Sequence, residues 1–240
     1  MILSIIVPVY NEKNTILELI DKVLLAQLPT GLSKEIIIVN DGSSDGTKEK
    51  LDQIKPSPEI KIYHSPKNLG KTHAVTFGLQ QSTGDIIIIQ DADLEYSPRY
   101  YSYLIEPILN KKTQIVYGSR FIGRIKKMAL INRMANCISN FTINLLFGTK
   151  ITDFHTCYKM FTRDALKNIS ITSQNFSFDT EITAKFLKNG FSIMELPIEY
   201  TARSRKEGKK INWHLALETY GVLFKVRFEN NLLNGEILHY

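Results

Sequence analysis

The stretch Asp85-Ile-Ile-Ile-Ile-Gln-Asp-Ala-Asp-Leu-Glu95 decides how the chain is expected to fold. Its four consecutive isoleucines form an unbroken β-branched run, which predicts a strand buried on both faces. Asp91 and Asp93 follow this strand, and open α/β sheets bind ligands at the carboxyl ends of their strands. Because two close carboxylates repel each other, a hard divalent cation, Mg²⁺ or Mn²⁺, is expected between them, where it would hold nucleotide phosphates. The alternative is a surface turn in which the two aspartates only solvate the end of the strand.

Length and charge limit the classes of protein that fit. The chain has 240 residues, enough for one large α/β domain or two small ones. Lysine and arginine exceed aspartate and glutamate by 30 to 24, which favours anionic partners such as nucleotides and lipid phosphates. We find no nucleic-acid recognition motif, so nucleic acid is not an expected partner. Cys137 and Cys157 are too few for a metal cluster and indicate reduced thiols in a cytosolic protein.

The first residues, Met1–Pro8, lack a basic leader and a cleavage site, so they are expected to form a strand and not a signal peptide. No apolar run approaches the roughly 20 residues that span a bilayer. We therefore expect a cytoplasmic protein that is soluble or peripheral at the cytoplasmic face of a membrane.

Strands and helices are expected to alternate through the first third of the chain. The expected strands cover residues 2–9, 35–39, 60–64 and 85–89, and the expected helices cover 14–28, 46–54 and a segment that begins near 68–73 and ends at 81. This order predicts a mostly parallel sheet with helices on both faces. The strand ends then bring Tyr10–Glu12, Asn40–Asp41, Gly70–Lys71 and Asp91–Asp93 to one edge. Such an edge has the groups needed to hold a nucleoside diphosphate.

Three motifs carry a resemblance to a known family. Val7-Pro-Val-Tyr-Asn-Glu12, Ile38-Val-Asn-Asp-Gly-Ser-Ser-Asp-Gly46 and Gln90-Asp-Ala-Asp-Leu94 resemble the signature of family 2 glycosyltransferases of the GT-A fold. Within that family the chain is most similar to dolichyl-phosphate mannosyltransferases and other polyprenyl-phosphate sugar transferases. The similarity continues through Tyr117-Gly-Ser-Arg-Phe121, Thr152-Asp-Phe-His-Thr-Cys-Tyr-Lys159 and Glu207-Gly-Lys-Lys-Ile211.

The resemblance implies an α/β, Rossmann-like GT-A fold with a mostly parallel central sheet flanked by helices, followed by C-terminal amphipathic helices. It implies one domain over residues 1–240. Residues 1–95 would form the nucleotide-sugar-binding half, 96–211 the acceptor half and a basic loop, and 212–240 a C-terminal helix.

On the donor side, the resemblance implies that Pro8, Tyr10 and Glu12 line the nucleoside pocket and that Asp41 contacts the base or ribose. Many relatives have two aspartates where this chain has Asn40-Asp41, which leaves open which of the two contacts the base. The alternative for Tyr10 and Glu12 is ordinary loop anchoring.

Two further donor-side residues have two interpretations each. Lys71 lies at the start of a helix, where phosphate binds well, but a plain solvated lysine is the alternative. Glu95 follows Asp93 by two positions and either supplies a third metal ligand or only starts the next helix beside Ser97-Pro98.

On the acceptor side, the resemblance assigns roles to Arg120, Asp153 and Asp179, which with Asp93 form the candidate catalytic set. Arg120 would help form the acceptor site, with a salt bridge to a sheet-edge carboxylate as the alternative. Asp153 would orient groups from a loop over that site, whereas His155 in the same loop is expected to be structural. Asp179 matches the general base of relatives that act on hydroxyl acceptors; otherwise it complements a helix dipole. A phosphate acceptor is already an anion, so Asp179 would then orient groups.

Residues 124–147 are basic and apolar, which is typical of a helix in a membrane interface. The alternative is a helix pair packed on the core, and both can hold for different faces. After the last expected strand, five cationic side chains occur within residues 203–210. By resemblance this segment is a loop that closes over the donor diphosphate, with Arg203, Arg205, Lys209 and Lys210 as candidate ligands.

A final amphipathic helix is expected over residues 213–228, with Trp213, Leu217, Tyr220, Phe224 and Phe228 on one stripe. The stripe covers the core, rests on a membrane or packs a homodimer. Many polyprenyl-phosphate relatives end in transmembrane helices, whereas this sequence has no apolar run of that length. We therefore expect either a soluble-type member or a protein that depends on a membrane-anchoring partner.

Together these features predict an inverting, metal-dependent glycosyltransferase that moves a hexose from a GDP- or UDP-sugar to a dolichyl or undecaprenyl phosphate. Mg²⁺ or Mn²⁺ on Asp91 and Asp93 would act on the donor diphosphate. Transfer to a sugar hydroxyl of a cell-envelope glycan is the alternative within the fold. A nucleotide-sugar-binding protein without turnover, and a nucleotidyltransferase, are the alternatives of other classes.

Overall fold

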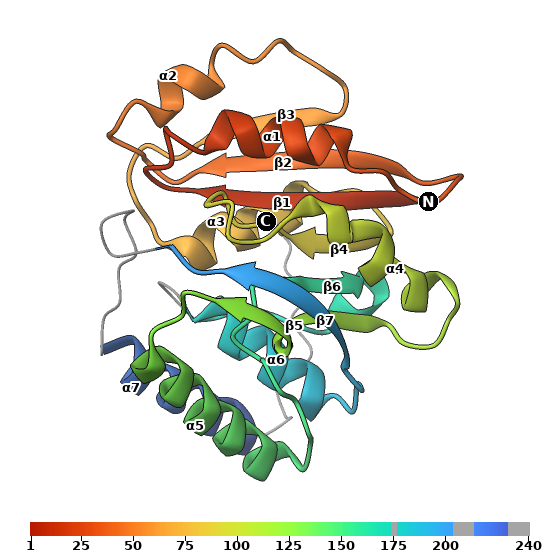
Figure 1. The fold of residues 1–240 in the computed structure, drawn as a ribbon, viewed down its shortest axis with the longest axis vertical. Coiled ribbons are helices and arrows are strands. Elements are labelled where there is room, and N and C mark those ends of the chain that lie inside the picture. The colour runs from red at the N-terminus through yellow and green to blue at the C-terminus, as the bar shows by residue number, and fades with distance from the viewer. Residues whose placement is uncertain (174–176, 204–213, 230–240) are drawn as a thin grey trace.

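The computed structural model describes residues 1–173, 177–203 and 214–229, and these form a central sheet covered by helices on both faces (Figure 1). The strand order is β3-β2-β1-β4-β6-β5-β7, and β6 alone runs antiparallel to its two neighbours within these residues. The strands are β1 (Ile2–Val9), β2 (Ser33–Asn40), β3 (Ile60–His64), β4 (Ile86–Ile89), β5 (Ile115–Lys126), β6 (Lys159–Thr162) and β7 (Met194–Thr201). The predicted mostly parallel α/β fold is confirmed.

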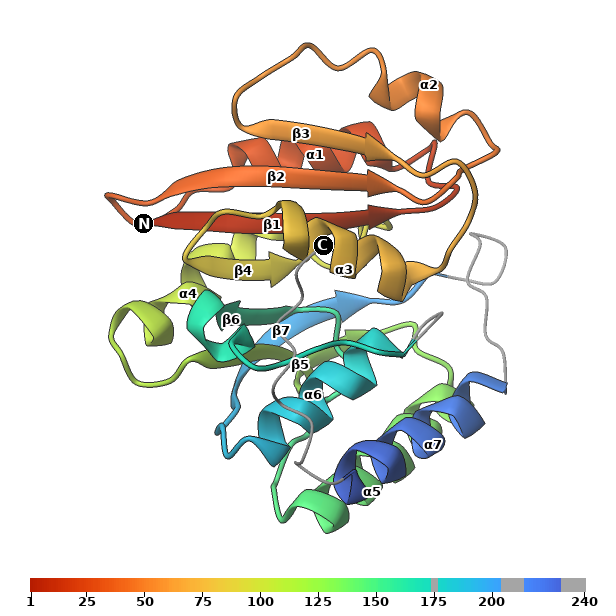
Figure 2. The same ribbon diagram turned by 180° about the vertical axis from the view of Figure 1, so that it is seen from behind.

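The helices divide between the two faces and one end of the sheet. They are α1 (Ile16–Leu25), α2 (Thr47–Leu51), α3 (Lys71–Gln81), α4 (Tyr101–Leu109), α5 (Leu130–Phe147), α6 (Phe178–Lys188) and α7 (His214–Phe228), with 3-10 turns η1 (Pro98–Tyr100) and η2 (Arg163–Leu166). Figure 1 shows α1 and α4 on the near face, and Figure 2 shows α3 and α6 on the opposite one. In both views α5 and α7 lie side by side beyond the β5–β7 end of the sheet.

The isoleucines of β4 pack into the apolar clusters on both faces of the sheet, as the sequence predicted. Ile86 and Ile88 pack in the cluster that contains α1 and α4, whereas Ile87 and Ile89 pack in the cluster that contains α6. Successive side chains of a strand point to opposite faces, so an unbroken apolar run is needed where both faces are covered. The strand therefore holds Asp91 and Asp93 at the carboxyl edge of a rigid sheet.

Two strands are longer than the sequence indicated. β5 was expected only near residues 114–116, but it runs to Lys126 with a register shift between Ser119 and Arg124. Gly123 allows the close approach, because a Cβ there would lie 1.9 Å from the carbonyl oxygen of Ile198 in β7. β7 continues through Pro197, which is tolerated because β7 is an edge strand.

The amino-terminal edge of the sheet is fixed by the buried carboxylate of Glu35. It accepts hydrogen bonds from the Ser4 hydroxyl at 2.6 Å, the Thr83 amide at 2.5 Å and the Gly84 amide at 3.0 Å, and Lys61 Nζ lies 3.0 Å away. One side chain thus ties β1, β2, β3 and the turn before β4 together at the end remote from Asp91.

Candidate functional site

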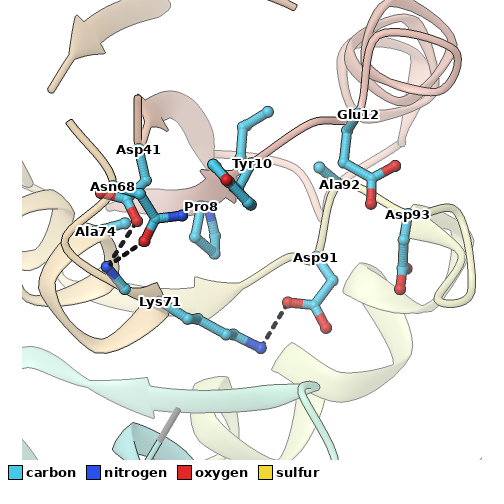
Figure 3. Close-up of a pocket in the computed structure, with 12 residues that line it drawn as sticks. Pro8, Tyr10, Glu12, Asp41, Asn68, Lys71, Ala74, Asp91, Ala92 and Asp93 are labelled. Carbon is cyan, nitrogen blue, oxygen red and sulfur yellow. Dashed lines mark hydrogen bonds and ion pairs between the residues drawn. The ribbon is translucent and has the colours of Figure 1, made fainter. Parts of the chain in front are cut away.

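A cavity of about 350 Å³ opens at the carboxyl edge of the sheet (Figure 3). It is lined by Pro8, Val9, Tyr10, Glu12, Asp41, Asn68, Gly70, Lys71, Ala74, Asp91, Ala92 and Asp93. The ends of β1, β2 and β4 and the start of α3 therefore meet here, as the alternation of strands and helices predicted. All the donor-side residues expected from the first 95 positions line this cavity except Glu95.

The structure separates the roles of Asn40 and Asp41. Asn40 is buried; its side-chain nitrogen lies 3.0 Å from His64 Nδ1, and its oxygen accepts a bond from the Ser43 amide. Asp41 lines the cavity and accepts bonds from the amides of Leu69 at 2.9 Å and Gly70 at 2.8 Å. Of the two, Asp41 is therefore the one placed to contact a nucleoside.

Lys71 is the cation at the inner wall of the cavity. Its Nζ lies 2.7 Å from Asp91 Oδ1 (Figure 3). The same atom lies 3.7 Å from Asp179 Oδ2 and donates to Cys157 Sγ at 3.1 Å. Burial alone would lower the pKa of Lys71, but the nearby Asp91 and Asp179 raise the pKa well above its usual value. Lys71 is thus a fixed, charged bridge between the donor cavity and α6, and the alternative of a solvated surface lysine is wrong.

Arg203, just after β7, reaches back into the donor cavity. Its guanidinium donates to both oxygens of Glu12, at 3.0 and 2.8 Å, and to Asp93 Oδ2 at 3.2 Å. Its backbone amide donates to Glu95 at 2.6 Å, and the Tyr200 hydroxyl donates to the same carboxylate at 2.5 Å. Residues more than a hundred positions apart in sequence therefore close one side of the site.

Asp91 and Asp93 fit a divalent cation. The pKa of Asp93 is raised to about 7 by its burial and by the like charges of Asp91 and Glu95, which outweigh Arg203. A carboxyl held so close to other carboxylates gains most from a cation. These two aspartates are hard oxygen donors on the cavity wall, which is the chemistry that Mg²⁺ and Mn²⁺ prefer.

The predicted third metal ligand, Glu95, does not join them. Its oxygens accept the bonds from Tyr200 and Arg203, and it does not line the cavity. Among the residues that the structure describes, no group of three or more His, Cys, Asp or Glu is arranged to hold a metal ion. The set Asp91, Asp93 and Glu95 is therefore corrected to the two aspartates, because Glu95 fastens the end of β7.

Asp179, at the start of α6, is held between two lysines. Lys159 Nζ lies 3.2 Å from Asp179 Oδ1, opposite Lys71 on Oδ2. Burial would raise the pKa of Asp179, but the two lysines lower it below its usual value. Asp179 is consequently ionised at neutral pH, and it lies in the first turn of α6, where the alternative interpretation has it complement the helix dipole.

Lys159 is a site residue that the sequence did not single out. Its side chain is fully buried and donates to the carbonyl oxygens of Phe154, at 2.7 Å, and Thr156, and it lies over the ring of Tyr117. Two signals were available in the sequence: Lys159 begins the short strand Lys-Met-Phe-Thr, and it ends the motif Thr152–Lys159 that carries the resemblance.

Arg120 and Asp153 lie close together, because they form a buried ion pair with each other. Asp153, fully buried, accepts bonds from Arg120 Nε and Nη2, both at 2.7 Å, and from the Arg120 amide at 2.9 Å. The pair lies beside Tyr200, whose ring centre is 5.0 Å from the Arg120 guanidinium carbon. His155 is half-buried, with its ring tilted against that of Phe154, and desolvation together with the nearby Lys159 and Arg120 lowers its pKa to about 4, so it is neutral at pH 7.

The helix α5 exposes its apolar face. Six large apolar side chains on one stripe are 57% to 77% exposed: Leu130, Ile131, Met134, Ile138, Phe141 and Leu145. The opposite face, which includes Ser139, Asn140 and Ile143, is buried against the protein. The alternative of a helix packed on the core therefore holds for the inner face of α5, and the apolar face is left uncovered within the described structure. The predicted segment 124–147 is corrected at its start, because Arg124–Lys126 belong to β5 and not to a helix.

Some predicted features lie outside the described residues. These are Arg205, Lys209 and Lys210 of the basic loop, and Trp213 of the final helix. In the described remainder of that helix, Phe224 and Phe228 are exposed and Leu223 and Val226 are buried. No helix in the described part of the chain has the length and apolarity required to span a membrane.

The architecture defines the class of the protein. In a comparison with solved structures, glucosyl-3-phosphoglycerate synthase of Mycobacterium tuberculosis, in complex with Mn²⁺, UDP and phosphoglyceric acid, superimposes with a TM-score of 0.73. The match covers 94% of this chain and 78% of the synthase at 17% identity, and therefore shows a shared GT-A fold.

Sequence comparison identifies the family. The model of glycosyl transferase family 2 matches residues 4–170, and the chain belongs to this family. It is 28% identical to a dolichol-phosphate mannosyltransferase of Pyrococcus furiosus, over 87% of this chain and 59% of the relative. It is 32% identical to a dolichyl-phosphate beta-glucosyltransferase of Trichomonas vaginalis, over 82% of this chain and 65% of the relative. The chain thus spans about three fifths of the length of these two curated relatives.

Proposed function

We propose that this protein transfers a hexose, with inversion, from a nucleotide sugar to a polyprenyl phosphate at a membrane surface. The observation that carries the proposal is the placement of Asp179 between Lys71 and Lys159, at the inner end of the donor cavity. The two curated relatives described above are named for dolichyl-phosphate acceptors, which supports the same acceptor class.

The lysines favour an acceptor that is already an anion. A general base works best when its pKa lies near the operating pH, but the pKa of Asp179 is lowered by Lys159 and Lys71. A phosphate needs no such base, because it is ionised at neutral pH. Two buried ammonium groups next to the donor cavity also attract a phosphate. In this role Asp179 orients the lysines and accepts no proton.

The donor would bind in the cavity with its base toward Tyr10 and Asp41 and its diphosphate toward Asp91 and Asp93. Mg²⁺ or Mn²⁺ held by these aspartates would neutralise charge on the departing nucleoside diphosphate. Arg203 pairs with Glu12 and Asp93, so its guanidinium would also lie within reach of the donor diphosphate. Apart from the contact of Arg203, we assign the donor contacts to residues 1–95 and the acceptor contacts mainly to residues 96–211 of one domain.

The exposed stripe of α5 supports peripheral contact with a membrane at its cytoplasmic face. Residues 121–152 contain no aspartate or glutamate, while Arg124, Lys126, Lys127 and Arg133 are exposed next to the stripe. Basic side chains beside an apolar helix face fit an anionic lipid surface. A lipid-linked phosphate would be reached from such a surface.

A transfer assay tests the proposal. The purified protein is incubated with Mn²⁺, vesicles that contain polyprenyl phosphate, and a panel of radiolabelled GDP- and UDP-sugars. We expect label from one donor to enter the organic phase and to be lost in Asp93→Asn. Label that appears only in water-soluble glycan would instead support a hydroxyl acceptor, for which Asp179 is in place at the start of α6. Nucleotide binding without consumption of any donor would support a binding protein.

A further inference from the structure

We infer that Asn140 and Asn144 on the inner face of α5 are positioning residues for the acceptor side of the site. The inference deepens the proposed function and rests on it. Its basis is the contact between these two side chains and the loop of residues 151–156. The proposed function assigns no role to this contact.

The inner face of α5 is unusually polar for a surface helix, although Ile143 on that face packs in an apolar cluster. Amphipathic helices usually bury their apolar stripe and expose their polar one. Here the apolar stripe faces outward, and Asn140 is buried on the inner face, with Asn144 half-buried one turn later. A buried amide must find partners, because each unmade hydrogen bond costs about 1–3 kcal/mol. The hydrogen-bond partners of these amides therefore indicate the role of the inner face of α5.

Both asparagines bind the backbone of the same loop. Asn144 donates to the carbonyl oxygen of Ile151 and accepts from the Ile151 amide, each at 2.8 Å. Asn140 donates to the carbonyl oxygen of Thr152 and accepts from the Phe154 amide at 3.2 Å. One helix face therefore holds four backbone groups of three residues in this loop, Ile151, Thr152 and Phe154.

The loop held in this way carries the acceptor-side charges. Asp153 lies between the bonded residues and forms the buried pair with Arg120. The carbonyl oxygen of Phe154 accepts from Lys159 Nζ, and this ammonium lies 3.2 Å from Asp179. The connection from Asn140 to Phe154, Lys159 and Asp179 is thus made of direct contacts. A shift of the loop therefore moves the ammonium that pairs with Asp179.

The same helix carries the stripe assigned to the membrane. Its outer face would set the depth of α5 in the lipid, and its inner face sets the place of the loop and Lys159. The asparagines would therefore fix where the reacting groups lie relative to the lipid surface, which holds the phosphate of the acceptor.

The chain provides a matched control for the test. Asn136 lies one turn before Asn140 on α5, but among the described residues its side chain donates only to the carbonyl oxygen of Asn132 in its own helix. We therefore compare Asn140→Leu and Asn144→Leu with Asn136→Leu, which makes the same chemical change on the same helix without touching the loop.

The measurements are kcat and KM for transfer to vesicle-borne polyprenyl phosphate, and the Kd of the nucleoside diphosphate that the active donor yields. We expect Asn140→Leu and Asn144→Leu to lower kcat by about 10- to 100-fold, because small misplacements of reacting groups cost this much. The Kd of the nucleotide should stay within about twofold of the wild type, since the donor cavity is built by other elements. Asn136→Leu should match the wild type in both measurements.

The outcomes separate this inference from the proposed function. If the wild type transfers sugar to polyprenyl phosphate and all three variants keep its kcat, the inference is overturned and the function stands. If the two loop variants also lose nucleotide binding, the asparagines only stabilise the fold and the inference is again overturned. If the wild type uses another acceptor, the proposed function fails, and the same comparison of kcat on that acceptor decides whether the asparagines position the loop.

Discussion

The buried pair of Arg120 and Asp153 gives the most quantitative prediction. Asp153→Asn keeps the shape of the side chain and removes its charge, which leaves the Arg120 guanidinium buried without a counter-charge. Arg120→Met removes the other partner, and Arg120→Met/Asp153→Leu removes both. The three variants together separate the cost of an unpaired charge from the value of the pair itself.

The expected loss of folding stability follows from the burial and the geometry of this ion pair. Asp153 is fully buried and Arg120 is 7% exposed, and they share two bonds of 2.7 Å. Removal of one partner of such a pair costs about 3–5 kcal/mol, whereas replacement of both by apolar groups is often nearly neutral. The double variant also loses the acceptor of the Arg120 amide, which adds about 1–3 kcal/mol. In a chain of this size each kcal/mol lowers Tm by about 2–4 °C, so the single variants should melt on the order of 10 °C lower.

Urea denaturation with a double-mutant cycle measures these free energies. We expect the double variant to be as stable as either single variant or more stable, so that the two single costs are far from additive. It should also retain nucleotide binding but transfer little sugar to polyprenyl phosphate, because we propose that the loop with Asp153 lies on the acceptor side. Asp153→Asn within about 1 kcal/mol of the wild type, or additive costs, would refute the reasoning about a buried, coupled pair.

Three further predictions follow from other parts of the structure. The pKa of Glu35 is lowered to about 2 from 4.5, so its ionised form stabilises the fold above pH 4.5 and this contribution is lost as the pH falls toward 2. Urea titrations should show Glu35→Gln less stable than the wild type by about 2–3 kcal/mol at pH 7, with the gap closing below pH 4.5; a gap independent of pH would contradict this. For Asp179→Asn we expect kcat with polyprenyl phosphate to fall by about tenfold or less, while a loss of about 10³-fold or more would show that it acts as a general base. Leu145→Glu on α5 should weaken sedimentation with anionic vesicles by about tenfold, and the equally exposed Leu25→Glu on α1 should not; equal effects would exclude α5 as the contact face.

The sequence predicted the donor half of the molecule well, for a physical reason. A buried parallel strand needs an unbroken apolar run, and the ligand-binding groups of such a sheet follow the strand ends directly in sequence. The isoleucines of β4 and the aspartates after them obey both rules, and β1 and β3 begin and end at the predicted residues. Local sequence therefore carried most of the information about the cavity.

The rest depended on contacts between distant segments. Glu95 has the spacing of a metal ligand, but its partners, Tyr200 and Arg203, lie over a hundred residues later. The sequence also gave no sign that Lys159 would meet Asp179, since only the packing of β6 against α6 brings them together. The extension of β5 was missed because Gly118-Ser-Arg120 and Gly123 interrupt its apolar residues, a feature that is typical of a loop.

The helix α5 shows a different kind of gap. Periodicity identifies which residues share a face of a helix, but it does not tell which face points inward. The asparagines face the protein because the loop at residues 151–154 offers backbone partners that apolar side chains do not satisfy. The segment was correctly predicted to be amphipathic, and its inner contacts became evident only in the structure.

The claim at the centre of this account is that the acceptor is a phosphate carried by a lipid. The most direct test compares initial rates on vesicles that contain polyprenyl phosphate with rates on vesicles that contain the free polyprenol of the same length, at pH 7 and with the active donor and Mn²⁺. Mass spectrometry of the extracted lipid identifies the product. We predict a hexosyl phosphate lipid from the first vesicles and no glycosylated lipid from the second. Transfer to the free alcohol at a similar rate, or to neither lipid while a soluble glycan is glycosylated, would contradict the account.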